Sequence, residues 1–214
     1  MHTRTLPLLT RRTLIAGLGG TTIFAALGPA AAQARLRPTP AQTEGPFYPV
    51  KFPADVDNDL LRIGGGEPAQ GEILHLRGHV RDVIGRPVRD AQVEIWQCDH
   101  RGVYRHPRDS GFARLDRNFQ GYGRTVTDAD GGYEFRTIKP VPYTGRTPHI
   151  HFAVAAPGRP RLITQMYLAG ERRNDGDFIY RRLGDAQSLV TVTLQPAAGT
   201  EPGILAASFD IVLA

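Results

Sequence analysis

The amino-acid sequence predicts an all-β protein, an antiparallel β-sandwich with long loops and an irregular N-terminal arm. Short segments that alternate apolar and polar residues recur at regular spacing, with turn-forming residues between them. No stretch keeps a helical period over three turns. The 24 glycines and 17 prolines in 214 residues exceed the combined average usage of about 12%, which favours many short elements joined by tight turns.

The strands can be placed in order along the chain. The first covers Ile73–Val80, alternates apolar and polar residues, and ends at a turn that contains Gly85. An Asp/Gly-rich turn at 127–132 leads into a later strand. The other strands are expected over Val93–Cys98, Tyr133–Ile138, His149–Val154, Leu162–Leu168, Leu189–Leu194 and Ala206–Leu213.

Residues 1–34 are expected to be an export signal of the twin-arginine type. They contain the pair Arg11-Arg12, then an uncharged run, and they end in a small-x-small site at 32–34. The alternative is an N-terminal membrane anchor, but the run is rich in glycine and poorly apolar for a membrane-spanning helix. We therefore expect a periplasmic or secreted protein.

The mature chain divides into an irregular arm over 35–70 and a β-sandwich domain over 71–214. The arm has no sustained period, but its aromatic motif at 43–49 favours packing on the domain. Without the leader, 23 basic residues face 21 acidic ones, a balance that gives no argument for nucleic-acid binding. The single cysteine, Cys98, excludes an intramolecular disulfide and a cysteine-rich zinc site.

The tripeptide His149-Ile150-His151 is the most informative feature of the domain. Residues i and i+2 of a strand share a face, so both imidazoles project together while Ile150 points the other way. Two neutral imidazoles from one strand would supply half of a metal site, and an ordinary pair of surface or core-edge histidines is the alternative.

Two tyrosines on loops strengthen the metal hypothesis. A Pro/Gly loop directly upstream of the histidines carries Tyr143 and Arg146, and an earlier loop carries Tyr104. Phenolates are hard anionic donors, and a bound cation lowers the phenol pKa from its ordinary value near 10. Two imidazoles with two phenolates would therefore suit Fe(III) better than Zn²⁺.

Longer motifs extend over nearly the whole mature chain. They are TEGPFYP (43–49), GxPVxxAxVEIWQ (85–97), GVYRHP (102–107), GRTVTDADGGYEFRTIKPVPY (123–143), HIHF (149–152), LITQMYLAG (162–170) and SFDIVL (208–213). In these motifs the chain resembles the intradiol ring-cleavage dioxygenases, and among them the iron-bearing (beta) subunit of protocatechuate 3,4-dioxygenase.

The resemblance implies a site for one Fe(III) per chain, with O2 as co-substrate. The metal ligands it implies are Tyr104, Tyr143, His149 and His151. Tyr143 would be the axial ligand that leaves the metal when a catechol binds, and it would take up a substrate proton as an internal base.

Two further residues are implied to act on the substrate. Arg146 matches the arginine that stabilises carbanion character on the ring, and Gln165 matches a glutamine near the substrate pocket. The expected reaction is cleavage of a catechol-type ring with O2 to a cis,cis-muconate-type diacid.

The substrate and the assembly stay open. Only Thr144-Gly145 separate Tyr143 from Arg146, where the protocatechuate enzymes have a longer, Trp-containing insertion. The expected partner is a catechol of unspecified substitution, with no nucleic acid and no membrane span in the mature chain. Self-assembly into a homo-oligomer and the role of His106 are left open.

Two alternative functions are considered. The stretch from Gly78 to Phe135 also resembles small carboxypeptidase-regulatory-like β-domains, which would make the chain a non-catalytic exported binding module. A mononuclear zinc hydrolase would need an acidic base near the histidines, for which Glu134 is the nearest candidate along the chain. Neither alternative explains why Tyr143, Arg146 and the histidines occur together.

Overall fold

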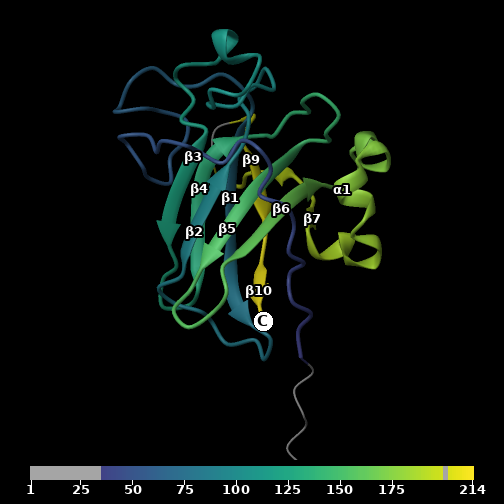
Figure 1. Cartoon of the computed structure of the whole chain (residues 1–214). Helices are drawn as coiled ribbons and strands as arrows, with labels where there is room; N and C mark the ends of the chain where they lie inside the picture. Colours follow the sequence, from purple (N-terminus) through teal and green to yellow (C-terminus); the bar gives the residue numbers. More distant parts are fainter. Residues whose placement is uncertain (1–34, 200–201) are drawn as a thin grey trace, which may run out of the picture. The chain divides into compact units, whose positions relative to one another are not determined.

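A computed structural model describes residues 35–199 and 202–214, so the predicted export signal lies outside the described residues. Two five-stranded sheets dominate this part of the chain (Figure 1). The first sheet contains β1 (Ile73–Asp82), β4 (Gly132–Ile138), β8 (Gln195–Pro196), β9 (Leu205–Ser208) and β10 (Ile211–Leu213). The second runs in the order β3 (Tyr122–Val126), β2 (Gln92–Trp96), β5 (His149–Ala155), β6 (Leu162–Leu168) and β7 (Thr191–Val192).

The prediction of a β-rich fold is confirmed, whereas the antiparallel character is confirmed only in part. Strands β2, β3, β5 and β6 pair antiparallel, as does β1 with β4. The pairs β1–β9, β1–β10 and β6–β7 are parallel. Alternation along a strand reports which face is buried, but it carries no information on the direction of the neighbouring strand.

Two strand predictions differ from the structure in detail. The expected strand at Leu189–Leu194 shrinks to β7, because the preceding residues form the 3-10 helix η3 (Gly184–Leu189). Strand β3 was not predicted, since its sequence YGRTV has a glycine where alternation would require a side chain. The other helices are short: η1 (Phe112–Arg114), η2 (Arg172–Gly176) and α1 (Phe178–Arg181).

The C-terminal segment, predicted as one strand, is divided into β9 and β10 at Phe209 and Asp210. Both parts keep the same register against β1, with Leu74 opposite Leu205 and Val80 opposite Ile211. At the break, the Tyr133 hydroxyl donates to the Phe209 carbonyl, and a Cβ at Gly78 would overlap that carbonyl. Only glycine therefore fits at position 78.

One hydrophobic core joins the two sheets. It receives Leu74, Leu76 and Phe135 from the first sheet and Ile150 and Phe152 from the second. The expected direction of Ile150 is thus confirmed, since it is fully buried in this core. Because side chains alternate along β5, His149 and His151 lie on the opposite face of the second sheet.

The arm lies over that opposite face and along the strand edges. The Gln42 amide donates to the Ile163 carbonyl of β6, and the Tyr48 hydroxyl donates to Glu94 of β2 at 2.8 Å. Asp57 accepts from the Arg124 amide at the edge of β3. By covering the outer face of the second sheet, the arm keeps side chains there out of water.

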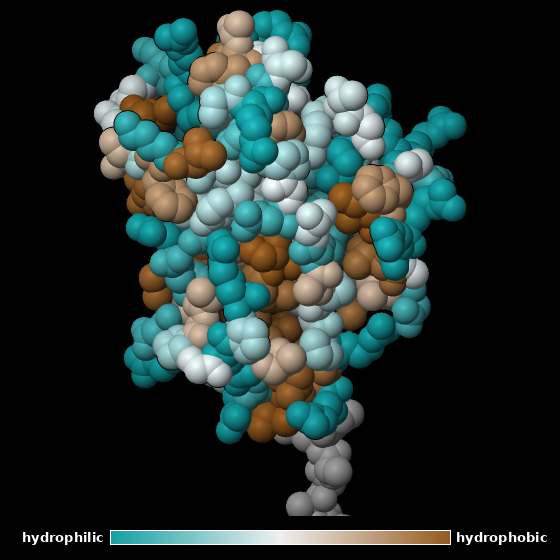
Figure 2. Space-filling model, viewed as in Figure 1, coloured by the Kyte–Doolittle hydropathy of each residue, from teal (hydrophilic) through white to brown (hydrophobic). Residues whose placement is uncertain are grey.

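Polar residues dominate the surface in the space-filling view, with smaller groups of hydrophobic residues between them (Figure 2). Among the described residues, no helix has both the length and the apolar character needed to cross a membrane.

Candidate active site

His149 and His151 open strand β5 with their ring nitrogens directed at one another. Their Nε2 atoms are 3.2 Å apart, and both residues are only 1% exposed. His149 Nδ1 lies 2.6 Å from the Thr147 carbonyl oxygen, which can only accept a hydrogen bond. Nδ1 therefore carries the proton in neutral His149, and its Nε2 offers a lone pair to the space beside His151.

Tyr104 is held by the loop that follows β2. Asp99 Oδ1 accepts from the amides of Arg101 and Val103, and Asp109 Oδ2 accepts from the Tyr104 amide at 2.9 Å. These short-range bonds between carboxylates and amides fix the loop without regular secondary structure. The Tyr104 ring is thereby turned inward and is 2% exposed.

Tyr143 is held by a four-residue turn after β4. The Arg146 amide donates to the Tyr143 carbonyl at 2.9 Å, and Gly145 has φ +75°, as a tight turn with glycine in its third position requires. The turn packs on the Tyr104 loop at Gly102, where a Cβ would lie 2.9 Å from the Pro142 carbonyl oxygen. Glycine at position 102 therefore lets the two tyrosine loops approach each other.

The four predicted metal ligands surround a common space. Ring centroids are 5.2 Å apart for Tyr104 and Tyr143, 5.5 Å for Tyr143 and His149, and 4.8 Å for His149 and His151. A fourth pair, Tyr104 and His151, has ring centroids 6.3 Å apart. The structure thus brings all four side chains together.

These residues fit a metal ion by two observations. Two nitrogen ligands with bonds of about 2.1 Å at a right angle lie about 3 Å apart, close to the separation of the two Nε2 atoms. The Tyr104 hydroxyl is buried and has no hydrogen-bond partner among the described residues. A buried phenol oxygen without a partner is costly, and a cation would satisfy it.

The protonation states are set mainly by burial. Burial, together with the Arg146 charge, lowers the pKa of His149 to about 3, and burial with His149 and Arg146 lowers the pKa of His151 well below its ordinary value. Burial raises the pKa of Tyr104 well above 10 and also raises that of Tyr143, where Arg146 opposes the shift. Both imidazoles are therefore ready to bind a cation, whereas each phenol needs the cation in order to ionise.

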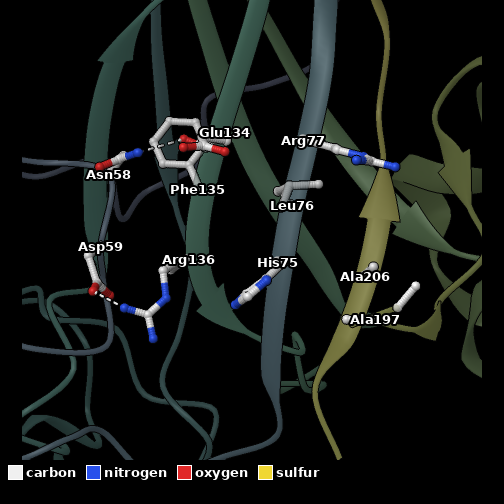
Figure 3. Close-up of a pocket in the computed structure, with 11 residues that line it drawn as sticks. Asn58, Asp59, His75, Leu76, Arg77, Glu134, Phe135, Arg136, Ala197 and Ala206 are labelled. Carbon is white, nitrogen blue, oxygen red and sulfur yellow. Dashed lines mark hydrogen bonds and ion pairs between the residues drawn. The ribbon is translucent and has the colours of Figure 1, made fainter. Parts of the chain in front are cut away.

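The tyrosines are essential to any metal site here. In the described part of the chain, no three His, Cys, Asp or Glu side chains lie together as a metal site would require. Glu134, the candidate base of a zinc hydrolase, lies instead in a hollow of about 510 Å³ on the outer face of β1 and β4 (Figure 3). That hollow also contains the ion pair of Asp59 with Arg136 at 2.6 Å and none of the four predicted ligands. Glu134 therefore cannot act as the general base of a zinc site at these histidines.

Arg146 lies beside the four donors and is held on three sides. Its Nε donates to Asp177 at 2.7 Å, its Nη2 to Gln165 Oε1 at 2.7 Å, and its Nη1 lies 3.5 Å from the Tyr143 hydroxyl. Burial opposes its charge, but Asp177 and Tyr143 raise the pKa of Arg146 above its ordinary value. The guanidinium is therefore a permanent cation beside Tyr143.

Gln165 connects Arg146 to the arm. It lies opposite His151 in the β5–β6 pairing, its Oε1 also accepts from the Tyr167 hydroxyl at 3.0 Å, and its Nε2 donates to the Thr43 carbonyl. Gln42 adds two donations from the arm, to Thr164 Oγ1 and to the Gln165 carbonyl. The arm thus completes the surroundings of the predicted site.

Sequence reasoning missed several residues of the site. Asp177 and Gln42 carry no local signal, because their partners are distant in the chain, and the Tyr167 hydroxyl contacts distant Gln42 as well as Gln165. Trp96 stacks on His151 at 4.7 Å, and this contact could have been inferred from the cross-strand pairing of β2 with β5. Phe47 of the arm stacks on Tyr104 at 4.6 Å.

Two other polar groups near the site, His106 and Cys98, are buried. His106 is fully buried, and its Nδ1 accepts from the Arg108 amide at 3.1 Å, which stabilises the loop after Tyr104. Burial raises the pKa of the Cys98 thiol to about 12, and the thiol lies 3.6 Å from the Val141 carbonyl oxygen. Cys98 is therefore a buried thiol of low reactivity.

The chain is similar to known proteins in sequence and in fold. Residues 43–214 match the family described as Dioxygenase. The protocatechuate 3,4-dioxygenase beta chain of Burkholderia cepacia is 38% identical over 179 residues, which cover 78% of this chain and 76% of that protein. The catechol 1,2-dioxygenase of Acinetobacter baylyi is 32% identical over 160 residues, 66% of this chain and 50% of that protein.

Other matches are longer proteins or solved structures. The hydroxyquinol 1,2-dioxygenase of Nocardioides simplex is 34% identical over 203 residues, and the match covers 82% of this chain but 64% of that protein. Among solved structures, the dioxygenase domain of a dioxygenase–carbohydrate-binding fusion from Streptomyces sp. SirexAA-E has a TM-score of 0.65 at 30% identity. That match covers 83% of this chain and 98% of the solved one.

The depressed pKa of the buried histidines predicts acid sensitivity of the metal-free protein. Below about pH 6.5 both histidines become protonated in the unfolded chain but stay neutral in the folded protein. The free energy of unfolding therefore decreases as the pH decreases. The expected slope reaches about 1.4 kcal/mol per pH unit for each histidine. Urea unfolding between pH 7 and 5 should show a shallower slope for His149→Gln, and equal slopes in both proteins would contradict the assignment.

The contact between the two tyrosine loops predicts a difference between two glycines. Gly102 and Gly145 both have φ +75°, but a Cβ at Gly145 would meet no atom within 4 Å. Both alanine substitutions carry left-handed strain of about 1–2 kcal/mol, whereas Gly102→Ala adds an overpacking cost of at least about 1 kcal/mol. Urea unfolding should therefore give a lower free energy of unfolding for Gly102→Ala than for Gly145→Ala. Equal free energies of unfolding would show that the two tyrosine loops do not constrain each other.

Proposed function

The chain belongs to the intradiol ring-cleavage dioxygenases, and on that premise we propose that it uses non-haem Fe(III) and O2 to cleave a catechol-type ring to a cis,cis-muconate-type diacid. The observation that carries the proposal is the meeting of Tyr104, Tyr143, His149 and His151 beside the Arg146 guanidinium. One iron per chain would occupy this set. The non-catalytic binding module is not favoured, since such a module has no use for these five side chains together.

The donor chemistry supports iron over zinc. Two phenolates are hard, anionic ligands, and with two neutral imidazoles they would balance most of the charge of a trivalent ion. When bound, Fe(III) would draw electron density from the catecholate ring and make a ring carbon reactive towards O2.

The residues of the chain would supply the proton transfer and the electrostatics. Tyr143 is half-buried, and burial raises its phenol pKa, so its phenolate is a competent acceptor for a proton from a substrate hydroxyl. Arg146 would stabilise the negative charge that develops on the ring, because its orientation is fixed before the substrate arrives. Gln165 would assist by holding one edge of the guanidinium.

The specific substrate is proposed only as a catechol. The relatives carry the names of three activities, on protocatechuate, hydroxyquinol and catechol. The short turn at Thr144-Gly145 replaces the insertion that shapes the pocket of the protocatechuate enzymes, which argues for a different ring substituent. A homo-oligomer and export by the twin-arginine-type leader are proposed with it, the latter from residues 1–34 alone.

Iron loading should give a red-brown protein, because tyrosinate-to-iron charge transfer absorbs visible light. Tyr104→Phe and Tyr143→Phe should each shift or weaken that band and lower kcat by at least about tenfold. Tyr180→Phe is the matched control, since its hydroxyl contacts Thr191 outside the donor set. Absorbance spectra and oxygen uptake check both effects.

The same assay identifies the substrate and the cleavage position. Oxygen uptake with catechol, protocatechuate, hydroxyquinol and substituted catechols, read with product spectra, should give muconate-type diacids from at least one of them. A colourless protein with stoichiometric zinc, or an extradiol product, would refute the proposed function.

A further inference from the structure

Asp177 is a buried carboxylate with four hydrogen-bond donors and two distinct contact sets. Its Oδ1 accepts from the amides of Ile179 and Tyr180, both at 3.0 Å, and so caps helix α1. Its Oδ2 accepts from Arg146 Nε at 2.7 Å and from the Thr147 amide at 3.0 Å. One oxygen thus belongs to the helix, and the other faces the candidate site.

The ion pair between Asp177 and Arg146 is shielded from water. The Asp177 side chain is fully buried and that of Arg146 is 10% exposed, so solvent screens their attraction little. Arginine donates in a fixed planar fork, and holding one edge therefore determines where the other edges point.

Two of the three guanidinium nitrogens of Arg146 are held by protein oxygens, and the third faces the Tyr143 hydroxyl. Asp177 takes Nε and Gln165 takes Nη2, which leaves Nη1 directed at the Tyr143 hydroxyl from 3.5 Å. Without Asp177, the guanidinium would keep Gln165 as its only contact below 3 Å among the described residues, and it could rotate about that bond. The orientation of Nη1 thus depends on a residue 31 positions further along the chain.

We propose that Asp177 is a positioning residue for ring cleavage, which holds Arg146 so that Nη1 faces the substrate space beside Tyr143. The inference rests on the proposed function, since it assigns the residue that orients the arginine of that reaction. It also gives the segment from η2 to α1 a role in catalysis, because this segment carries Asp177 to the site.

The two oxygens of Asp177 allow its two roles to be separated. Serine is a favoured N-cap residue, so Asp177→Ser keeps the cap of α1 and removes the contact with Arg146. Glu171→Ala is the matched control. Glu171 caps the neighbouring helix η2 through the Arg173 amide at 2.9 Å and is not in contact with Arg146.

The test compares iron-loaded wild type, Asp177→Ser, Glu171→Ala, Arg146→Gln and the double variant with Arg146→Gln and Asp177→Ser. Asp177→Ser should lower kcat by about 10- to 100-fold, as expected for a misplaced catalytic group. KM should change by less than about threefold, and Glu171→Ala should match the wild type. In the Arg146→Gln background, Asp177→Ser should cost less than about twofold, because its effect passes through Arg146.

A second measurement distinguishes positioning from loss of the metal site. Iron content and the visible absorption band of Asp177→Ser should equal those of the wild type. Loss of iron or colour, an unchanged kcat, or effects of Arg146→Gln and Asp177→Ser that multiply would each overturn the proposal. Absence of ring cleavage in the wild type would instead refute the proposed function itself, so the two failures are distinguishable.

Discussion

The two-residue period of strand β5 is the constraint on which the site depends. It sends Ile150 and Phe152 into the core between the sheets and places His149 and His151 on the outer face, where their Nε2 atoms meet at 3.2 Å. An outer face would ordinarily be wet. Here the arm lies over it, with Phe47 stacked on Tyr104, so the imidazoles and the phenol are buried although they lie outside the core. The fold thus provides a second, polar interior on the far side of one sheet.

The charge balance of this polar interior explains why its donors stay reactive. Burial holds both histidines neutral and both phenols protonated, which leaves Arg146 with its partner Asp177 as the charged pair at the site. A cation that binds these four donors would cause both phenols to lose their protons and bind as phenolates. Arg146 already favours the ionised form of Tyr143, because its charge lowers the pKa of that phenol. The guanidinium therefore influences the site twice, through the protonation of a ligand and through the charge that develops on the substrate ring.

The features that could be predicted from the sequence are those set by neighbouring residues in the chain. Alternation located most strands and the shared face of the two histidines, and the resemblance to a known family singled out Tyr104 and Tyr143 as their partners. Alternation did not predict β3, because Gly123 interrupts the pattern there, and it could not assign the parallel pairing of β1 with β9. Asp177 and Gln42 were missed for a different reason. Their contacts join segments 31 and 123 residues apart, and only the folded chain brings these together.

Anomalous diffraction at the iron absorption edge, on crystals of the iron-loaded protein, would locate the metal relative to the four donors. We expect one strong peak per chain within bonding distance of Tyr104 Oη, Tyr143 Oη, His149 Nε2 and His151 Nε2. A peak elsewhere, or bonding that omits either phenol oxygen, would contradict this expectation.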